Sequence, residues 1–381
     1  MTRPATSPQG AMAAFLPVYE PDLSGNERRY VDQAVTSTWI SSRGEFINRF
    51  EDAFGQVVGN PHVSTVCNGT VALHLALHCL DLKPGDEVIV PSFTYIASVN
   101  TIIQAGAVPV FAEIRQEDWL VDPADVARRI TPRTRAIMPV HLYGAVCDMD
   151  ALHALARSHG LAMVEDCAEA LGSTWRGRHV GSFSDVATFS FFGNKTVTTG
   201  EGGMVMARDA DMLRKLTIAK GQGMDPERRY WHIAMGFNYR MTNIAAAIGL
   251  GQIERLDSIL QRKRGIARQY RSLLSNQPVT FQRPRPEVES SEWLISLLLP
   301  AGVDRDAVMQ RMAEARIETR PVFYCAHHMP HHRRPELSLP ISEDIAARGI
   351  SLPSYPTLTE GDVERICATL VDAIRASGPP R

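Results

Sequence analysis

The sequence predicts an α/β protein, with a large domain built on a mainly parallel sheet and a smaller α+β domain at the C-terminus. The chain has 381 residues, which is more than one compact domain usually contains. Between about residues 61 and 206, short apolar runs alternate with amphipathic segments, the pattern of successive βαβ units. A helical stretch and the Pro-rich stretch 278–286 then separate a shorter C-terminal region.

Five apolar runs in the first region are predicted strands, at residues 87–90, 108–111, 135–140, 161–165 and 186–189. Helices are predicted at residues 70–79, 123–130 and 149–158. The last helix should end at Gly160, because glycine readily adopts the left-handed conformation that closes many helices. In such a sheet the chemistry lies at the carboxyl ends of the strands.

The second region begins inside a helical stretch. The periodicity of residues 244–274 is interrupted near Asp257, so we place the domain boundary near residue 255. The two predicted domains are residues 1–255 and residues 256–381. In the second domain we expect a strand at residues 292–299 and helices at residues 305–315 and 360–376.

The composition is that of a globular protein, with 44% hydrophobic and 22% charged residues. Lys and Arg number 40 against 42 Asp and Glu, so no sequence-wide basic field exists to hold nucleic acid or an anionic membrane. Six scattered cysteines without a CxxC pair indicate reduced thiols. The apolar stretch 11–18 contains Pro17 and is too short for a signal or membrane helix, so we expect a cytoplasmic protein.

An acid and a lysine follow two of the predicted strands. Asp166 stands directly after residues 161–165, and Lys195 follows the aromatic strand end 189–192. A lysine near aromatic side chains loses hydration, which favours the neutral amine that forms a Schiff base. An acid at a neighbouring strand end can hold a protonated heterocyclic nitrogen, so the pair predicts a pyridoxal phosphate site. A surface lysine and a helix-capping aspartate are the alternative interpretation.

Seven ordered stretches of the chain resemble the DegT/DnrJ/EryC1/StrS sugar aminotransferases, within the aspartate aminotransferase-like (fold type I) pyridoxal phosphate enzymes. The resemblance runs from about Pro17 to Ala373. Its stretches are Cys67–Leu73, Pro91–Tyr95, His141–Gly144, Glu165–Glu169, Ser190–Lys195, Gly200–Gly203 and Gly236–Met241. Seven matches in order are specific, whereas each alone is weak.

The resemblance implies the cofactor pyridoxal 5'-phosphate and roles for two catalytic residues. Lys195 would carry the cofactor and later move the proton between the sugar carbon and the cofactor. Asp166 would pair with the pyridinium nitrogen and keep the ring cationic. No metal is expected.

The resemblance also implies the cofactor-binding residues. Gly69 and Thr70, at the start of a helix, and Ser190 would bind the phosphate, although an ordinary turn and helix N-cap explains the first two equally well. Tyr95 would stack on one face of the ring and Ala168 on the other, with a core aromatic as the alternative for Tyr95.

Four further residues complete the implied site. Glu169 would lie near the phenolic oxygen of the cofactor, where many relatives carry Gln or His. Asn238 would reach the cofactor phosphate of a neighbouring subunit, which implies a homodimer with shared active sites, and Arg240 and His327 would bind the substrate. The segment 238–240 can alternatively cap the helix that begins near Thr242.

Two basic clusters suggest a metal site and a basic patch, and neither is expected. Pro330 separates the pairs His327–His328 and His331–His332, and no carboxylate or thiol completes a metal shell in the sequence. The run Arg262–Arg264 lies in a helical stretch and is predicted to be a solvated face.

The implied reaction moves the amino group of L-glutamate to C4 of a nucleotide-linked 4-keto-6-deoxy sugar. Residues 193–200 and 226–232 most resemble the perosamine-forming subgroup, which predicts GDP-4-keto-6-deoxy-D-mannose as substrate and GDP-perosamine as product. A 4-aminotransferase for a UDP-4-keto-6-deoxy sugar is the first alternative. A pyridoxal phosphate lyase and a non-catalytic regulatory protein of the same fold remain as further alternatives.

Overall fold

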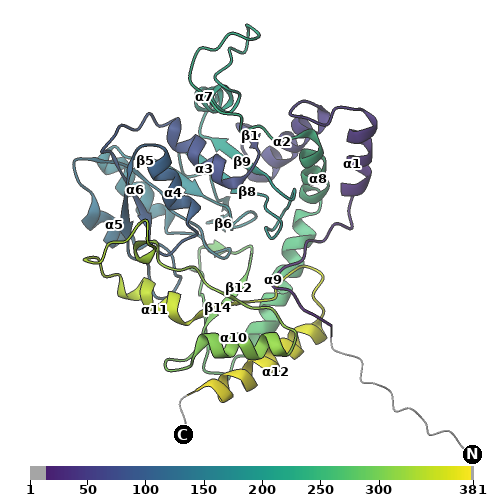
Figure 1. Ribbon diagram of the computed structural model, residues 1–381, viewed down its shortest axis with the longest axis vertical. Coiled ribbons are helices and arrows are strands. Elements are labelled where there is room, and N and C mark those ends of the chain that lie inside the picture. Colours follow the sequence, from purple (N-terminus) through teal and green to yellow (C-terminus); the bar gives the residue numbers. More distant parts are fainter. Residues whose placement is uncertain (1–13, 379–381) are drawn as a thin grey trace, which may run out of the picture.

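The computed structural model describes residues 14–378, so the predicted apolar stretch 11–18 lies partly outside the described residues. Its central sheet has seven strands in the order β1–β9–β8–β5–β4–β2–β3 (Figure 1). The strands are β1 (Val63–Val66), β2 (Glu87–Pro91), β3 (Val108–Ala112), β4 (Thr134–Ile137), β5 (Ala162–Asp166), β8 (Val186–Ser190) and β9 (Gly203–Ala207). Strand β9 runs antiparallel to both of its neighbours, and the other pairings are parallel. The predicted mainly parallel sheet is therefore confirmed.

All five predicted strands are present, and β4 shows the largest difference in its bounds. The prediction extended this strand to Val140, but the ladder to β5 ends at Ile137. Val140 instead makes an isolated parallel bridge to Asp166. The chain thus stays beside β5 as far as the end of that strand without forming a continuous ladder.

From residue 14 onward, eight helices precede the long helix α9: α1 (Glu27–Thr36), α2 (Glu45–Val58), α3 (Gly69–His78), α4 (Ala97–Gln104), α5 (Pro123–Arg129), α6 (Met149–His159), α7 (Ala210–Lys220) and α8 (Asn243–Ile253). Helix starts are marked by side chains that accept backbone N–H groups, such as Asn68 before α3 and Thr242 before α8. Gly160 closes α6 with φ of 63°, as predicted.

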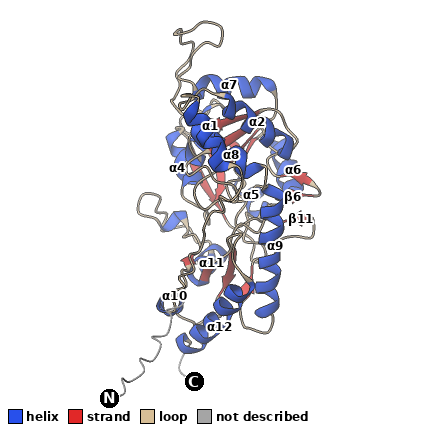
Figure 2. Ribbon diagram, turned by 90° about the vertical axis from the view of Figure 1, so that its right-hand side faces the viewer, coloured by secondary structure: helices blue, strands red, loops and turns tan. Residues whose placement is uncertain are grey.

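Helix α9 (Leu256–Leu273) runs from the large sheet toward the C-terminal helices (Figures 1 and 2). These are α10 (Arg305–Glu314), the 3-10 helix η1 (Ala326–His328), α11 (Pro340–Arg348) and α12 (Glu360–Ser377). They accompany an antiparallel sheet ordered β10 (Thr280–Phe281), β12 (Ile295–Leu298), β14 (Gly349–Leu352) and β13 (Arg320–Pro321). A third small sheet joins β11 (Val288–Glu289), β6 (Thr174–Trp175) and β7 (Arg178–His179).

Two clusters of buried apolar side chains lie in these layers. The larger surrounds the seven-stranded sheet and includes Trp293 and Leu294, which precede β12. The smaller lies between α9, α10, α12 and the antiparallel sheet, and Leu16 belongs to it. Both cores therefore draw on residues from the two ends of the chain. The domain boundary near residue 255 stays a prediction.

The run Arg262–Arg264 was predicted to be a solvated face, and this interpretation is wrong for its central residue. The Lys263 side chain is only 1% exposed, and its amine donates to two backbone carbonyls. Arg262 is exposed and Arg264 is partly buried, and both donate to carbonyl oxygens. The cause is the position of α9, whose face at Lys263 packs against the segments before β12 and after β14.

Candidate active site

The predicted catalytic residues lie at the carboxyl ends of two neighbouring strands. Asp166 ends β5, Ser190 ends β8, and Lys195 follows five residues later. Strands β5 and β8 are parallel, with Asp166 opposite Thr188. Parallel neighbours end at the same edge of a sheet, so the structure brings these side chains to one edge.

The Lys195 side chain is 13% exposed and lies between a carboxyl group and an aromatic ring. Its Nζ is 3.4 Å from Glu169 Oε1. The same nitrogen lies 4.0 Å from the centroid of the Trp293 ring, within the range of a cation–π contact. Trp293 was not predicted, because it lies about one hundred residues away in the sequence.

Glu169, whose carboxylate contacts this amine, is buried. Burial raises the pKa of Glu169 to about 7, although Lys195 and the backbone N–H of Tyr143 counteract part of the rise. Its second oxygen, Oε2, accepts that N–H at 3.1 Å. A carboxyl group that changes protonation near neutral pH is thus in contact with the lysine amine.

The motif His141–Gly144 has a geometric explanation. Tyr143 takes a left-handed φ of 58°, which is rare for a bulky residue and common at functional sites. Its N–H then reaches Glu169, and its ring stacks on Trp293 with centroids 6.2 Å apart. A Cβ on Gly144 would lie 2.9 Å from the backbone nitrogen of Trp293, so only glycine permits this close approach.

Asp166 is buried and held on both carboxylate oxygens. Ser98 Oγ donates to Oδ2 at 2.7 Å, and the Ala168 N–H donates to Oδ1 at 3.1 Å. Ser98 lies on α4, two residues after Ile96, and no feature of the sequence marked it. The carboxylate is therefore oriented before any ligand arrives, which is how a fixed charge acts on a bound group.

The start of α3 meets the end of β8. A Cβ on Gly69 would lie 2.7 Å from Ser190 Cβ and 3.0 Å from Ser190 Oγ, so these two residues are in close contact. Asn68 Oδ1 accepts the Val71 N–H at 2.9 Å, which confirms the helix N-cap interpretation of this segment. Thr70 is exposed on the first helical turn. A helix N-terminus beside a serine hydroxyl can bind an anion such as a phosphate.

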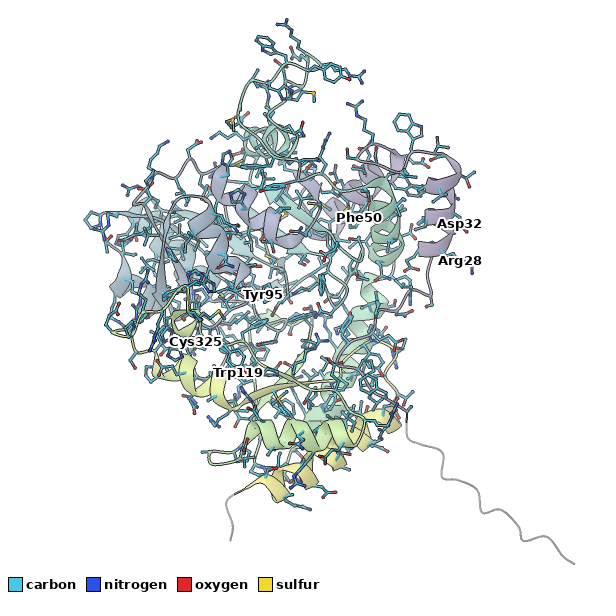
Figure 3. All side chains as sticks on the ribbon, viewed as in Figure 1. Arg28, Asp32, Phe50, Tyr95, Trp119 and Cys325 are labelled. Carbon is cyan, nitrogen blue, oxygen red and sulfur yellow. The ribbon has the colours of Figure 1, made fainter. Side chains whose placement is uncertain are left out.

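Tyr95 is 58% exposed, so the alternative that it is a core aromatic is wrong. Its ring contacts Phe323, with centroids 5.8 Å apart, and Phe93 pairs with Cys325. Figure 3 labels Tyr95 and Cys325 in this part of the molecule. Ala168 is half-buried two residues after Asp166. Both predicted ring-stacking residues therefore remain accessible at the edge of the site.

Asn238 and Arg240 flank Tyr239, whose backbone oxygen accepts the Cys67 N–H at 2.8 Å, two residues before Gly69. Asn238 is exposed, and its Oδ1 accepts the Arg240 guanidinium at 3.1 Å. The segment 238–240 does not cap α8, because Thr242 supplies the capping oxygen at 3.2 Å from the Ala245 nitrogen.

His327 is fully buried, and both of its ring nitrogens have partners. Nδ1 lies 2.6 Å from Ser92 Oγ, and Nε2 lies 3.2 Å from Glu343 Oε1. Glu343 also lies 3.8 Å from His328, so the structure supplies the carboxylate that the sequence argument found missing beside these histidines. His327 and His328 line a cavity of about 540 Å³ together with Arg333 and Arg334. The positive charges of the two arginines disfavour a cation in this cavity. The absence of a bound metal stays a prediction.

Comparison with known proteins was made on this fold and site. The DegT/DnrJ/EryC1/StrS aminotransferase family model matches residues 21–371. The GDP-perosamine synthase of Vibrio cholerae is 49% identical, over 93% of this chain and 97% of that protein. The GDP-perosamine synthase of Escherichia coli O157:H7 is 47% identical, over 93% and 98%. The Streptococcus pneumoniae protein Spr1654 in its pyridoxal phosphate form has a TM-score of 0.91 at 27% identity, over 96% and 100%.

The fold and the grouped lysine, carboxylates and helix terminus define a pyridoxal phosphate enzyme with the aspartate aminotransferase-like fold. The chain belongs to the DegT/DnrJ/EryC1/StrS aminotransferase family. The cofactor of this family is pyridoxal 5'-phosphate. Among the helices described between residues 14 and 378, none is long and apolar enough to cross a membrane.

Proposed function

We propose that this aminotransferase moves the amino group of L-glutamate to C4 of GDP-4-keto-6-deoxy-D-mannose and so produces GDP-perosamine. The relatives named GDP-perosamine synthase, which match nearly the whole chain, support the substrate. The observation that carries the chemistry is the contact of the Lys195 amine with Glu169, at the strand edge that also holds Asp166.

The residues present fit the cofactor at both of its ends. The contact between Gly69 and Ser190 supports a phosphate site at the start of α3, with Thr70 adding an exposed hydroxyl. The buried Asp166 carboxylate would hold the ring nitrogen in its protonated form. Tyr95 and Ala168 would cover the two faces of the ring. When bound, pyridoxal phosphate supplies an electron sink for a carbon that loses a proton.

The residues of the chain would then handle the protons. Lys195 Nζ would hold the cofactor and act as the base that removes and returns the proton at the reacting carbon. Glu169 would donate or accept a proton through Oε1, since its pKa of about 7 lets both forms exist near neutrality. A protonated Glu169 also removes the repulsion that an ionised carboxylate would exert on a phenolate oxygen.

The functional unit would be a homodimer in the cytoplasm, with Asn238 serving the cofactor phosphate of the partner subunit. The loop between α7 and α8 protrudes from the molecule (Figures 1 and 2) and exposes large apolar side chains. Tyr230 is 73% exposed, Trp231 51% and Met235 85%. Surfaces of this kind are typical of protein interfaces. The exposed Asn238 and the partly buried Arg240 lie at the base of this loop, where Asn238 pairs with Gly221.

Substrate contacts differ from the sequence prediction at one position. The guanidinium of the partly buried Arg240 is bonded to Asn238 and would bind the nucleotide sugar in the partner's site. His327 has both ring nitrogens engaged, so we propose that it shapes the wall near Tyr95 through Ser92 instead of contacting the sugar with a free nitrogen.

The function is tested by supplying the purified holoenzyme with L-glutamate and matched GDP- and UDP-linked 4-keto-6-deoxy sugars. Mass spectrometry should show an amino sugar from the GDP substrate, with 2-oxoglutarate formed in equal amount, and no product from Lys195→Ala. Preferred conversion of the UDP sugar would instead favour the alternative 4-aminotransferase. Loss of a group from the sugar without amino transfer would indicate a lyase, and a protein that binds no cofactor would indicate a non-catalytic role.

A further inference from the structure

Two successive backbone carbonyls at the candidate catalytic lysine are held by aromatic side chains from distant parts of the chain. Trp293 Nε1 donates to Asn194 O at 2.7 Å. The Tyr19 hydroxyl donates to Lys195 O at 2.8 Å. A turn held at two consecutive carbonyls has little freedom to rotate, so the direction in which the Lys195 side chain leaves the backbone is restricted.

Trp293 restrains the amine of the same lysine as well as its backbone. The ring lies 4.0 Å from Nζ, and it is itself fixed in a row of aromatic residues. Tyr143 stacks on it with an interplanar angle of 14°, and Phe323 stacks on Tyr143 at 17°. These contacts restrict the position of the ring that faces the amine.

A second buried lysine, Lys263, contacts both Trp293 and Tyr19. Lys263 Nζ donates to Trp293 O at 2.9 Å and to Ser354 O at 2.8 Å, and it lies 5.0 Å from the centroid of the Tyr19 ring. Burial lowers the pKa of Lys263 to about 7. Burying an amine is costly, and an apolar side chain would fill the space without that cost. The two carbonyl bonds and the ring contact account for an amine at this position.

We propose that Tyr19, Trp293 and Lys263 form a clamp that positions Lys195, with Lys263 as the anchor that joins the two aromatic residues. This inference rests on the proposed role of Lys195. All three are positioning residues: they set where the amine stands relative to Glu169, and they bring no proton of their own to the reaction. The clamp also ties the catalytic turn to α9 and to the segments beside β12 and β14.

The variants are Tyr19→Phe and Trp293→Phe, which each remove one hydrogen bond to the turn, and Lys263→Met, which keeps the length of the side chain without the amine. Matched controls exist in the same chain. Tyr270→Phe removes a buried hydroxyl bond of 2.8 Å to Pro353 O and leaves in place both hydrogen bonds to the carbonyls of Asn194 and Lys195. Trp175→Phe replaces a buried indole whose N–H has no hydrogen-bond partner among the described residues.

Hydride reduction and peptide mapping of the wild type first identify the lysine that carries pyridoxal phosphate. If it is another lysine, the proposed catalytic assignment fails, and the clamp fails with it. If it is Lys195, the capture rate of pyridoxal phosphate by the cofactor-free variants is followed by visible absorbance. Tyr19→Phe and Trp293→Phe should each slow capture and the glutamate half-reaction about five-fold to ten-fold, the effect of one lost hydrogen bond. KM should change less than kcat.

Hydrogen–deuterium exchange of the cofactor-free proteins gives a readout independent of activity. The peptide covering residues 191–199 should exchange faster in the three clamp variants and at the wild-type rate in Tyr270→Phe and Trp175→Phe. In the double variant Tyr19→Phe/Trp293→Phe, the fold decrease in capture rate should be smaller than the product of the two single decreases, because both bonds hold one turn. The clamp is wrong if Lys195 carries the cofactor and the folded Tyr19→Phe and Trp293→Phe variants match the controls in both exchange and capture rate. This conclusion does not depend on whether Lys263→Met is stable.

Discussion

At the scale of single residues, the protonation of Glu169 connects the site to stability. Burial places its pKa at about 7 in the folded protein, against 4.5 for the ordinary carboxyl group. Lys195, Asp166 and the Tyr143 N–H are the groups that face it. Between these two values the folded protein holds a proton that the unfolded chain has released. The contribution of Glu169 to stability is therefore fully present below about pH 4.5 and is lost as the pH rises through about 7.

Glu169→Gln should make this part of the stability independent of pH. As the pH rises from about 4.5 to about 7.5, the cofactor-free variant should gain up to about 3 kcal/mol of unfolding free energy relative to the wild type. Urea unfolding at several pH values measures the difference. Equal pH dependence of the two proteins would show that Glu169 titrates in the folded protein as it does in the unfolded chain.

Sequence reasoning located some site residues and missed others for a physical reason. Asp166 and Lys195 could be predicted because each follows a strand, and strand ends of a parallel sheet meet. Ser98, Tyr19 and Trp293 could not, because their contacts exist only after distant segments have packed. Lys263 was misinterpreted because a lysine between two arginines resembles a solvated helix face until the packing of α9 is known.

At the scale of elements, the contact between α3 and β8 shapes the proposed phosphate site. Gly69→Ala would place a methyl group 2.7 Å from Ser190 Cβ, so the start of the helix must move away from the strand end. We expect cofactor affinity to fall at least about ten-fold, as is typical when a close backbone approach is lost. Titration of the cofactor-free protein with pyridoxal phosphate measures it.

Two further variants separate this contact from general effects of replacing glycine. Gly361→Ala on α12 meets open space and should leave affinity unchanged. Adding Ser190→Gly to Gly69→Ala removes the colliding Cβ and should restore part of the affinity, although the hydroxyl is lost. An affinity of Gly69→Ala equal to that of the wild type would place the phosphate elsewhere.

Element bounds were predictable where the local signal is strong. Asp148 and Gly160 bracket α6, and the break in periodicity near Asp257 corresponds to the junction between α8 and α9. Strands β1 and β9 were both missed. They pair with each other across about 140 residues, although β9 also pairs with the nearby strand β8. The two-residue strands were missed as well, because pairing with distant segments defines them and their own sequence does not.

At the scale of the whole molecule, the proposed dimer predicts complementation between two inactive variants. In a mixed dimer of Lys195→Ala and Asn238→Asp, one site carries both lesions and the other carries neither. Random subunit exchange makes half of the dimers mixed, so about a quarter of wild-type activity should return. Each parent alone should stay inactive. Mixed dimers that are confirmed by mass and remain inactive would contradict the shared site.

The boundary between the two domains is harder to predict from the sequence than the fold class is. Apolar segments before β12 join the larger core, and Leu16 joins the smaller one, so contacts cross the predicted boundary in both directions. The break in periodicity near Asp257 marks where the chain enters α9, and α9 itself connects the two layers. Only the packed structure shows which residues each core contains.

The central claim, that Lys195 is the lysine of a pyridoxal phosphate aminotransferase, is tested most directly by labelling. The holoenzyme is reduced with borohydride and digested, and the modified peptide is identified by mass spectrometry. Lys220 and Lys263 are the natural competitors, because both amines are buried and burial lowers the pKa of each. The account predicts a pyridoxyl group on Lys195 alone, absent from Lys195→Ala. A label on Lys220 or Lys263 in the wild type would contradict it.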